Sequence, residues 1–501
     1  MITQRDDSCY FSFLSGLLTV IIVLAVVLGE VQGNPQGNSF KVGSQKQLFI
    51  DESLIASKSN VTLRMNPPVK TQERNLIAEH PWEELELGWV NVLEVNGEYK
   101  MWYGCESIGK SARQDTEAEQ ETSRVVDLCY ATSKDGVRWE KPPLGLVEFR
   151  GSKKNNIVMR NVFGTVFLDP KRLDGNLYKL AGSRRPNKGL EIFTSPDGLR
   201  WEPFKDQPVL SKGYFDTQNQ IFWDDAVNAY VTFVRRWVEF SETRVPLCCR
   251  KVGRSVSQNL SAWPEPEIVY GHDANDPVES DPYNASVVKY PGAPNVYLMF
   301  PSAYFHIPNR KNDGPLDIQL ATSRDGIKWQ RIEREPYVRM GVDGSFDSGS
   351  IYMAVGMFVK EPEVWMYYVG YDILHGLLDL KRHRHKGVIS RVVQRLDGFV
   401  SADAGYTGGE LTTTPIVFNG RELTLNLDTG AMGETRVEIL DENNRVVPGF
   451  SAGDSDPING NFISRAVTWK GKTDVSQLAG KAVKLRFVMR STKLYAFQFR
   501  N

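Results

Sequence analysis

The sequence predicts an all-β protein, a five-bladed β-propeller followed by a small C-terminal β-sandwich. The first observation behind this prediction is a repeated turn phrase that ends in tryptophan. Residues 131–139, 193–201 and 321–329 read ATSKDGVRW, FTSPDGLRW and ATSRDGIKW. Residues 254–263 (RSVSQNLSAW) are a degenerate copy, and residues 396–399 (LDGF) are a weaker fifth one. The four tryptophans are spaced by 62, 62 and 66 residues, which indicates five similar units.

The second observation is an aromatic-rich strand ahead of each turn phrase. Residues 99–103, 178–181, 230–234, 297–300 and 365–369 read YKMWY, YKLA, YVTFV, YLMF and WMYYV. Turn residues precede most of these runs, and another apolar strand precedes each turn. Each unit therefore reads as an inner strand, an aromatic strand, a Thr-Ser strand and a Trp strand. Four antiparallel strands per repeat are typical of a propeller blade, so we predict the propeller over residues 71–401.

The period stops after about residue 402. Strand-like runs at 422–428, 435–441, 464–470, 482–489 and 493–500 alternate with Gly and Asn, and they predict a β-sandwich over residues 402–501. Residues 34–70 are interpreted as a linker and N-terminal strand segment. Its strands either pack on the sandwich or lend a closing strand to the propeller.

Residues 1–33 are interpreted as a signal peptide or an N-terminal anchor. Residues 11–29 form an apolar run, and small residues near Gly33 offer a cleavage point. About 20 apolar residues can also span a bilayer, so an uncleaved anchor stays open. Both interpretations predict an exported protein that is periplasmic, secreted or anchored outside the cytoplasm. A membrane is a partner only if the segment is uncleaved.

The composition excludes some partners and cofactors. The net charge is −1, so no basic surface is expected for nucleic acid. Aromatic residues make up 11% of the chain, which fits a sheet-rich protein that handles sugars. No cysteine spacing resembles a zinc site, and no EF-hand loop is present, so we predict no cofactor and leave a structural calcium near the propeller axis open. Cys105 and Cys129 fall on neighbouring predicted strands and are either bridged or buried free thiols.

Strand order predicts which end of the blades carries a site. The Asp-Gly turns lie at one end, and Asp135, Asp197 and Asp325 are interpreted as turn residues. Inner strands start, and aromatic strands end, at the opposite end. The carboxylates predicted there as catalytic are Asp216, Asp281 and Asp347. The substrate-binding candidates are Arg235, Arg236, Asn284, Tyr304, His306, His375, Glu84, Glu86 and Glu279. Carboxylates serve glycoside chemistry as acid, base or nucleophile, while Arg, His and aromatic side chains bind sugar.

With these turn phrases and this blade count, the chain resembles the five-bladed propeller glycoside hydrolases of the invertase and arabinanase type, families 32 and 43, and their exported bacterial relatives. Those families use an Asp in the first blade, an Asp in the second and a Glu in the third. The invertase signature Trp-Met-Asn-Asp-Pro-Asn-Gly is missing here, and Arg235-Arg236-Trp237 stands in place of Arg-Asp-Pro. No catalytic residue is therefore carried over from the families.

The resemblance implies an exported carbohydrate-active enzyme, a glycoside hydrolase that uses two carboxylates on an oligosaccharide or polysaccharide. One alternative is a non-catalytic propeller that binds glycans. A second is a glycoside phosphorylase, which needs a phosphate site near Arg184, Arg235 or Arg236.

Overall fold

The computed structural model describes residues 39–501, apart from residues 110–123, 185–188, 214, 239–249, 309–312 and 377–385. Residues 39–501 form one compact unit. The segment predicted as a signal peptide or anchor lies outside the described residues, as do Cys9, Cys248 and Cys249. Among the described residues, no helix is long and apolar enough to cross a membrane.

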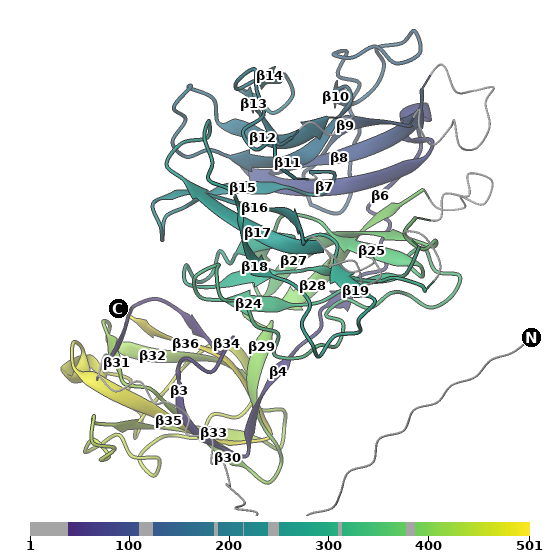
Figure 1. Cartoon of the computed structure of the whole chain (residues 1–501). Helices are drawn as coiled ribbons and strands as arrows, with labels where there is room; N and C mark the ends of the chain where they lie inside the picture. The colour runs from purple at the N-terminus through teal and green to yellow at the C-terminus, as the bar shows by residue number, and fades with distance from the viewer. Residues whose placement is uncertain are drawn as a thin grey trace, which may run out of the picture. The chain divides into compact units, whose positions relative to one another are not determined.

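The protein is all-β, as the sequence predicts (Figure 1). The helical segments of the described residues are two 3-10 turns, η1 (Pro81–Glu83) and η3 (Ser476–Leu478). The strands follow the repeat, and each of the first three repeats forms a four-stranded antiparallel sheet. These sheets comprise β7 (Glu86–Val95), β8 (Glu98–Ile108), β9 (Arg124–Ser133) and β10 (Ile157–Met159); β11 (Val162–Leu168), β12 (Tyr178–Arg184), β13 (Glu191–Ser195) and β14 (Glu202–Pro203); and β15 (Gln220–Asp224), β16 (Ala229–Trp237), β17 (Arg250–Ser257) and β18 (Glu267–Tyr270).

The fourth repeat is divided between two sheets, because its strands break in the middle. One sheet contains β20 (Val287–Lys289), β21 (Tyr297–Met299) and β24 (Ala321–Ser323). The continuing strands β19 (Ser280–Pro282), β22 (Ser302–Phe305) and β23 (Leu316–Ile318) belong to a larger sheet with the fifth repeat. The fifth repeat supplies β25 (Ser350–Met353), β26 (Phe358–Lys360), β27 (Glu363–Tyr371) and β28 (Val388–Arg395).

The fifth repeat takes its outer strands from residues 69–77, at the end of the N-terminal segment and just ahead of the first repeat. β5 (Val69–Lys70) and β6 (Leu76–Ile77) both pair antiparallel with β28. The weak fifth turn phrase at residues 396–399 does not add an outer strand of its own to this repeat. Instead β29 (Val400–Ala404) leaves the repeat and pairs with strands at the two ends of the chain.

The C-terminal strands form two six-stranded sheets together with strands from residues 40–65 (Figure 1). One sheet contains β2 (Gln47–Leu48), β4 (Val61–Met65), β29, β32 (Glu422–Asp428), β34 (Asn461–Ala466) and β36 (Thr492–Arg500). The other contains β1 (Phe40–Gly43), β3 (Ile55–Ser59), β30 (Gly409–Thr413), β31 (Ile416–Phe418), β33 (Glu434–Leu440) and β35 (Ala482–Arg490). The N-terminal segment therefore does both things that the sequence left open. It packs on the C-terminal sheets and it closes the last repeat.

The Asp-Gly turns are structural, as predicted. In the first turn, Asp135 Oδ1 accepts hydrogen bonds from the amides of Val137 and Arg138, each at 2.8 Å. Asp197 and Asp325 accept the equivalent bonds in their own turns. The turn tryptophans pack against neighbouring repeats. Trp139 meets Tyr367 of the fifth repeat edge to face at 5.8 Å.

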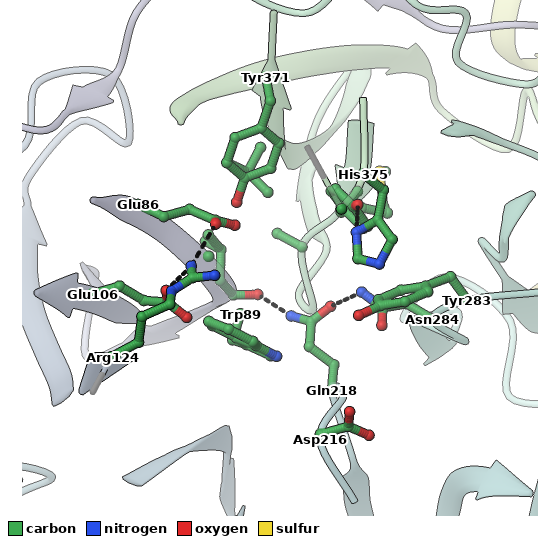
Figure 2. Close-up of a pocket in the computed structure, with 17 residues that line it drawn as sticks. Glu86, Trp89, Glu106, Arg124, Asp216, Gln218, Tyr283, Asn284, Tyr371 and His375 are labelled. Atoms are coloured by element: carbon green, nitrogen blue, oxygen red, sulfur yellow. Dashed lines mark hydrogen bonds and ion pairs between the residues drawn. The ribbon is translucent and has the colours of Figure 1, made fainter. Parts of the chain in front are cut away.

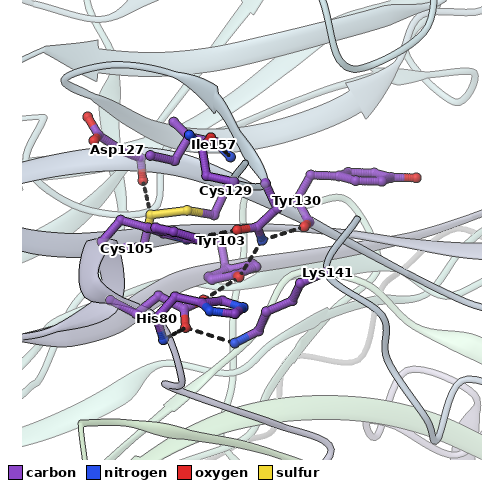
Figure 3. Close-up of a disulfide and its surroundings, with 12 residues drawn as sticks. His80, Tyr103, Cys105, Asp127, Cys129, Tyr130, Lys141 and Ile157 are labelled. Atoms are coloured by element: carbon purple, nitrogen blue, oxygen red, sulfur yellow. Dashed lines mark hydrogen bonds and ion pairs between the residues drawn. A yellow bond between two sulfur atoms is a disulfide. The ribbon is translucent and has the colours of Figure 1, made fainter. Parts of the chain in front are cut away.

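A disulfide joins Cys105 on β8 to Cys129 on β9, so the bridged alternative is confirmed (Figure 3). Both cysteines are fully buried. A buried polar network lies next to the bridge, where Tyr103 donates a hydrogen bond to Glu83 at 2.6 Å and accepts one from Asn156 at 2.8 Å. The bridge and this network both tie β8 to its surroundings, close to the strand end that carries the site described next.

Candidate functional site

A cavity of about 240 Å³ lies where inner strands start and aromatic strands end. Strand β9 shows the direction, because it begins at the cavity with Arg124 and ends in the first Asp-Gly turn with Ser133. The cavity is therefore at the opposite end of the strands from that turn. Its lining combines carboxylates, amides and aromatic rings: Glu86, Gly88, Trp89, Val90, Glu106, Arg124, Asp216, Gln218, Tyr283, Asn284, Tyr352, Met353, Ala354, Val369, Tyr371, His375 and Gly376 (Figure 2).

One wall carries two carboxylates that share an arginine. Figure 2 shows the Arg124 guanidinium between Glu86 at the start of β7 and Glu106 near the end of β8. Arg124 pairs with Glu86 at 3.2 Å and also with Glu106, which is fully buried. Burial disfavours the charge on Arg124, but the carboxylates of Glu106 and Glu86 outweigh it and raise the pKa of the guanidinium. Glu86 keeps 26% of its side chain exposed, so it can still meet a ligand.

A third carboxylate, Asp216, lines the cavity just ahead of β15. Its side chain is 52% exposed and pairs with the buried guanidinium of Arg235 at 2.7 Å. Beside it, Gln218 donates to the Val90 carbonyl at 2.8 Å and accepts a longer bond of 3.4 Å from Asn284. Asp216 is therefore anchored by strand β16, while the amides of Gln218 and Asn284 link the first, third and fourth repeats around the cavity.

Trp89 forms an aromatic part of the wall in a strained backbone conformation. Its φ is 47°, a left-handed value that bulky residues rarely adopt. The strain coincides with an irregular register in β7 between Gly88 and Asn91. The ring lies over Gly104, where an added Cβ would come within 2.7 Å of it, and packs on Phe163 at 4.8 Å. Strain of this kind is concentrated at functional sites.

The side of the cavity formed by the fourth and fifth repeats is aromatic. Tyr283 packs edge to face on His375 at 4.4 Å, and the Tyr352 hydroxyl lies 2.8 Å from His375 Nδ1. Burial, followed by the charges of Arg250 and Arg235, lowers the pKa of His375 to about 3. The imidazole is therefore neutral at ordinary pH, so it can exchange hydrogen bonds with a sugar hydroxyl but carries no charge.

The buried histidines predict that the protein loses stability in mild acid. Burial also lowers the pKa of His272 to about 4. Both rings stay neutral in the folded protein at pH 5, whereas the unfolded chain binds a proton at each below about pH 6.5. The free energy of unfolding should thus fall as the pH drops from about 6.5 towards 4. The upper limit is about 1.4 kcal/mol per pH unit for each histidine. The actual fall should be smaller, because both rings keep some contact with solvent. Urea unfolding at pH 7 and pH 5 should show that His375→Gln and His272→Gln each lose less stability between the two pH values than the wild type does. A loss equal to that of the wild type in both variants would contradict this.

Four further predicted residues lie together behind the aromatic wall. Asp281 on β19 is buried between Arg250, at 3.3 Å, and His306 Nε2, at 3.4 Å. Tyr304 packs on His306 at 4.0 Å and on His375 at 5.0 Å. Arg235 stacks on Tyr283 at 4.5 Å. These groups position the cavity wall, but Asp281, Tyr304, His306 and Arg235 do not line the cavity themselves.

The remaining predicted residues lie elsewhere. Asp347 lines a separate depression, where it pairs with Lys70 at 2.7 Å and accepts a hydrogen bond from Tyr368 at 2.9 Å. Glu84 pairs with Arg150, and Arg236 pairs with Glu265 at 2.9 Å. The Glu279 carbonyl accepts the amide of His306 at 2.8 Å. The expectation that Asp216, Asp281 and Asp347 meet in one cavity thus does not hold, because Asp281 and Asp347 are each turned towards a cation outside it.

Sequence reasoning missed several residues of the lining, chiefly Glu106, Arg124 and Trp89. Glu106 could have been found, because it follows the aromatic strand of the first repeat as Arg235 follows that of the third. Arg124 opens a Thr-Ser strand, whose start also lies at this end of the sheet. Nothing in the sequence marks the bulge that turns Trp89 into the cavity.

Among the described residues, no group of three or more His, Cys, Asp or Glu side chains is placed to hold a metal ion.

No protein-family model and no curated protein matches the sequence. Several solved structures resemble the chain. One is a glycoside hydrolase family 43 arabinoxylan arabinofuranohydrolase from Bacillus subtilis in complex with cellotetraose. It is 10% identical with a TM-score of 0.42, and the match covers 87% of this chain and 99% of that one. An N-acetylgalactosamine deacetylase from F. plautii in complex with blood group B trisaccharide has 16% identity and a TM-score of 0.44, covering 67% and 96%. A structure from family 130, described as mannoside phosphorylases that include hydrolases of β-1,2-mannosidic linkages in Candida mannan, has 13% identity and a TM-score of 0.40, covering 70% and 97%. Glycoside hydrolases with propeller folds are thus among the solved structures similar to this chain.

Proposed function

We propose that this chain is a glycoside hydrolase that binds an oligosaccharide or polysaccharide in the cavity. The observation that carries the proposal is the composition of the cavity wall. Three carboxylates, the amides of Gln218 and Asn284, and several aromatic rings meet there around about 240 Å³ of space. Amides and carboxylates match sugar hydroxyls, aromatic faces match the C–H faces of pyranose rings, and paired carboxylates supply the chemistry of glycoside cleavage.

The working pair that we propose is Glu86 and Asp216. Both line the cavity and retain exposed side chains, and they come from different repeats. One of them would protonate the glycosidic oxygen, and the other would attack the anomeric carbon or activate a water molecule. Glu106 is fully buried against Arg124, and we assign it a positioning role that holds Arg124 and, through it, Glu86.

We also propose the fold and location that the sequence predicts. Residues 71–401 would form a five-bladed propeller, supported by the strand groups that follow each repeat and by the closing strands β5 and β6. Residues 402–501 would form a β-sandwich, supported by the two six-stranded sheets. The apolar run at residues 11–29 supports export from the cytoplasm.

A non-catalytic glycan-binding protein is the second candidate. It is favoured by the ion pairs of the cavity, because Arg124 holds Glu86 and Glu106 while Arg235 holds Asp216. Phosphorolysis has less support. Arg184, Arg235 and Arg236 each pair with an acidic side chain, Glu191, Asp216 and Glu265 respectively.

The test is a screen of the protein against plant and algal polysaccharides and their oligosaccharides, with two readouts. Release of reducing ends reports cleavage, and affinity electrophoresis reports binding. Cleavage of at least one glycan supports the hydrolase. A glycan that binds but is cleaved neither with nor without added phosphate supports the second candidate. If no glycan is bound or cleaved, both candidates are contradicted.

Trp89 is expected to be a major contributor to substrate binding. Trp89→Ala should lower kcat/KM about 10- to 100-fold, because a pyranose ring loses its stacking surface. Trp89→Phe should retain most of the activity. Trp89→Asn should also lose the activity. Its melting temperature should be equal to or higher than that of Trp89→Ala, because Asn tolerates the positive φ at this position. Steady-state kinetics and thermal melts of the three variants check this, and full activity in Trp89→Ala would contradict it.

A further inference from the structure

The C-terminal sheets carry a second surface that the cavity does not use. The turn between β29 and β30, residues 405–408, separates two shallow depressions of about 480 and 450 Å³. Gly405 lines the first depression, and Thr407 and Gly408 line the second. Tyr406 stands in the turn between these lining residues, lines neither depression itself, and is 69% exposed. No residue of this surface lines the catalytic cavity.

The backbone that presents Tyr406 is held in place. The Gly408 amide donates to the Gly405 carbonyl at 3.1 Å and closes the turn. The Ser491 amide donates to the same carbonyl at 2.9 Å, which ties the turn to the β35–β36 connection. Gly408 has a φ of 85°, a value that suits glycine at the end of such a turn. A ring on a preorganised turn loses little entropy when a ligand packs on it.

An exposed aromatic ring is not by itself a binding site, but a second apolar group lies on the same surface. Met432, in the β32–β33 connection, is 68% exposed and lines the first depression together with Gly405. The walls are otherwise polar and ordered. Lys493 bonds Asp403 at 2.6 Å and Asn66 at 2.9 Å, and Arg436 bonds Glu434 at 2.7 Å.

The charges of this surface favour a neutral ligand. Asp403, Asp428, Glu410 and Glu434 are acidic, and Lys493, Arg436 and Arg490 are basic, so the two depressions together carry a net charge of −1. That balance offers no strong field for an anionic polymer. Acidic and basic groups that can bind hydroxyls, together with an exposed tyrosine and a methionine, instead match a neutral sugar chain, which presents hydroxyls at its edges and C–H groups on its faces.

We propose that Tyr406 and the two depressions beside it form a binding site for a neutral polysaccharide chain, separate from the catalytic cavity. The proposal rests on the proposed function only in the class of ligand, a carbohydrate. It assigns the C-terminal sheets the task of holding a long substrate, while the cavity acts on one stretch of it.

The test is affinity electrophoresis of the full chain in gels that contain galactomannan, arabinoxylan, xyloglucan or laminarin, with alginate as the anionic comparison. Tyr406→Ala should weaken retention by the polysaccharide that the wild type binds about tenfold, and Tyr406→Phe should restore it. The matched control is Leu173→Ala, which removes a side chain that is 75% exposed on another part of the chain and should leave retention unchanged.

Two measurements separate this proposal from the proposed function. Turnover of a short oligosaccharide should be unchanged in Tyr406→Ala, and retention should be unchanged in Asp216→Asn. Retention that depends on Tyr406 in a protein without turnover would contradict the hydrolase and support the second site. The second site is overturned if the wild type is retained by none of the neutral gels, if Tyr406→Ala is retained like the wild type, or if gel filtration shows that Tyr406 instead mediates self-association.

Discussion

Asp216→Asn and Glu86→Gln are each expected to lower kcat on an oligosaccharide by about 10²- to 10⁴-fold. Glu86→Gln should change the stability of the fold little because Arg124 keeps Glu106, whereas Asp216→Asn should lower it because the buried Arg235 loses an ionised partner. Both carboxylates line the cavity with exposed side chains, so the amides remove the proton chemistry while they keep the shape and much of the hydrogen bonding. Steady-state kinetics and thermal melts of the two variants measure the effect. Binding should persist in both, because the aromatic and amide walls are unchanged.

The control is Asp206→Asn, which alters an exposed aspartate that does not line the cavity and should leave kcat unchanged. Asp347→Asn provides a second comparison. It should lower stability, because Lys70 and Tyr368 lose an ionised partner, but the remaining folded protein should keep its kcat. Equal losses of kcat in Asp347→Asn and Asp216→Asn, or no loss in Asp216→Asn, would contradict the proposed pair.

Asp397→Ala is expected to be the most destabilising substitution in a turn phrase, at about 3–5 kcal/mol. Asp397 is fully buried, and it accepts hydrogen bonds from Tyr290 at 2.7 Å, Lys46 at 2.8 Å and Asn426 at 2.9 Å. These partners come from the fourth repeat, the N-terminal segment and the C-terminal sheets. Removing the carboxylate would leave the Lys46 ammonium group and the Tyr290 hydroxyl without this acceptor, and Asn426 would keep only its bond to the Leu396 carbonyl, while the site stays buried.

The matched control for Asp397→Ala is Asp135→Ala. Asp135 occupies the same place in the first turn phrase, but it is exposed and accepts hydrogen bonds from its own turn, so its loss should cost about 1 kcal/mol. Urea unfolding measures both. If Asp397→Ala fails to fold, Tyr290→Phe removes the bond that the hydroxyl donates to the carboxylate and the bond that it accepts from the Asp397 amide, and it should cost about 1–2 kcal/mol. Equal costs for the two alanine variants would show that Asp397 is an ordinary turn residue.

The repeats could be predicted from the sequence because their signals are local. A Ser, an Asp and a Gly within a few residues make the turn by themselves, and even the degenerate copy keeps its chemistry. There Asn259 Oδ1 accepts the amides of Ser261 and Ala262, as Asp135 accepts those of Val137 and Arg138. Asp397 shows where this local logic ends, because it has the turn sequence but bonds to groups that are far away along the chain.

The site could be predicted only in part, because chain order places a residue at a strand end without saying where its side chain points. Asp216 and Asp347 both precede the inner strand of a repeat, yet only Asp216 faces the cavity. Lys70, 277 residues away in sequence, draws Asp347 into another depression. The same limit hid Trp89, since its direction depends on a register shift between β7 and β8.

The central claim is that the cavity between Glu86 and Asp216 is a carbohydrate site. A crystal structure of Asp216→Asn with an oligosaccharide found in the screen tests it most directly, since the variant should bind the substrate without cleaving it. We predict a sugar ring stacked on Trp89, with its glycosidic oxygen within hydrogen-bond distance of Glu86 or of residue 216. An oligosaccharide that binds only outside this cavity would contradict the claim.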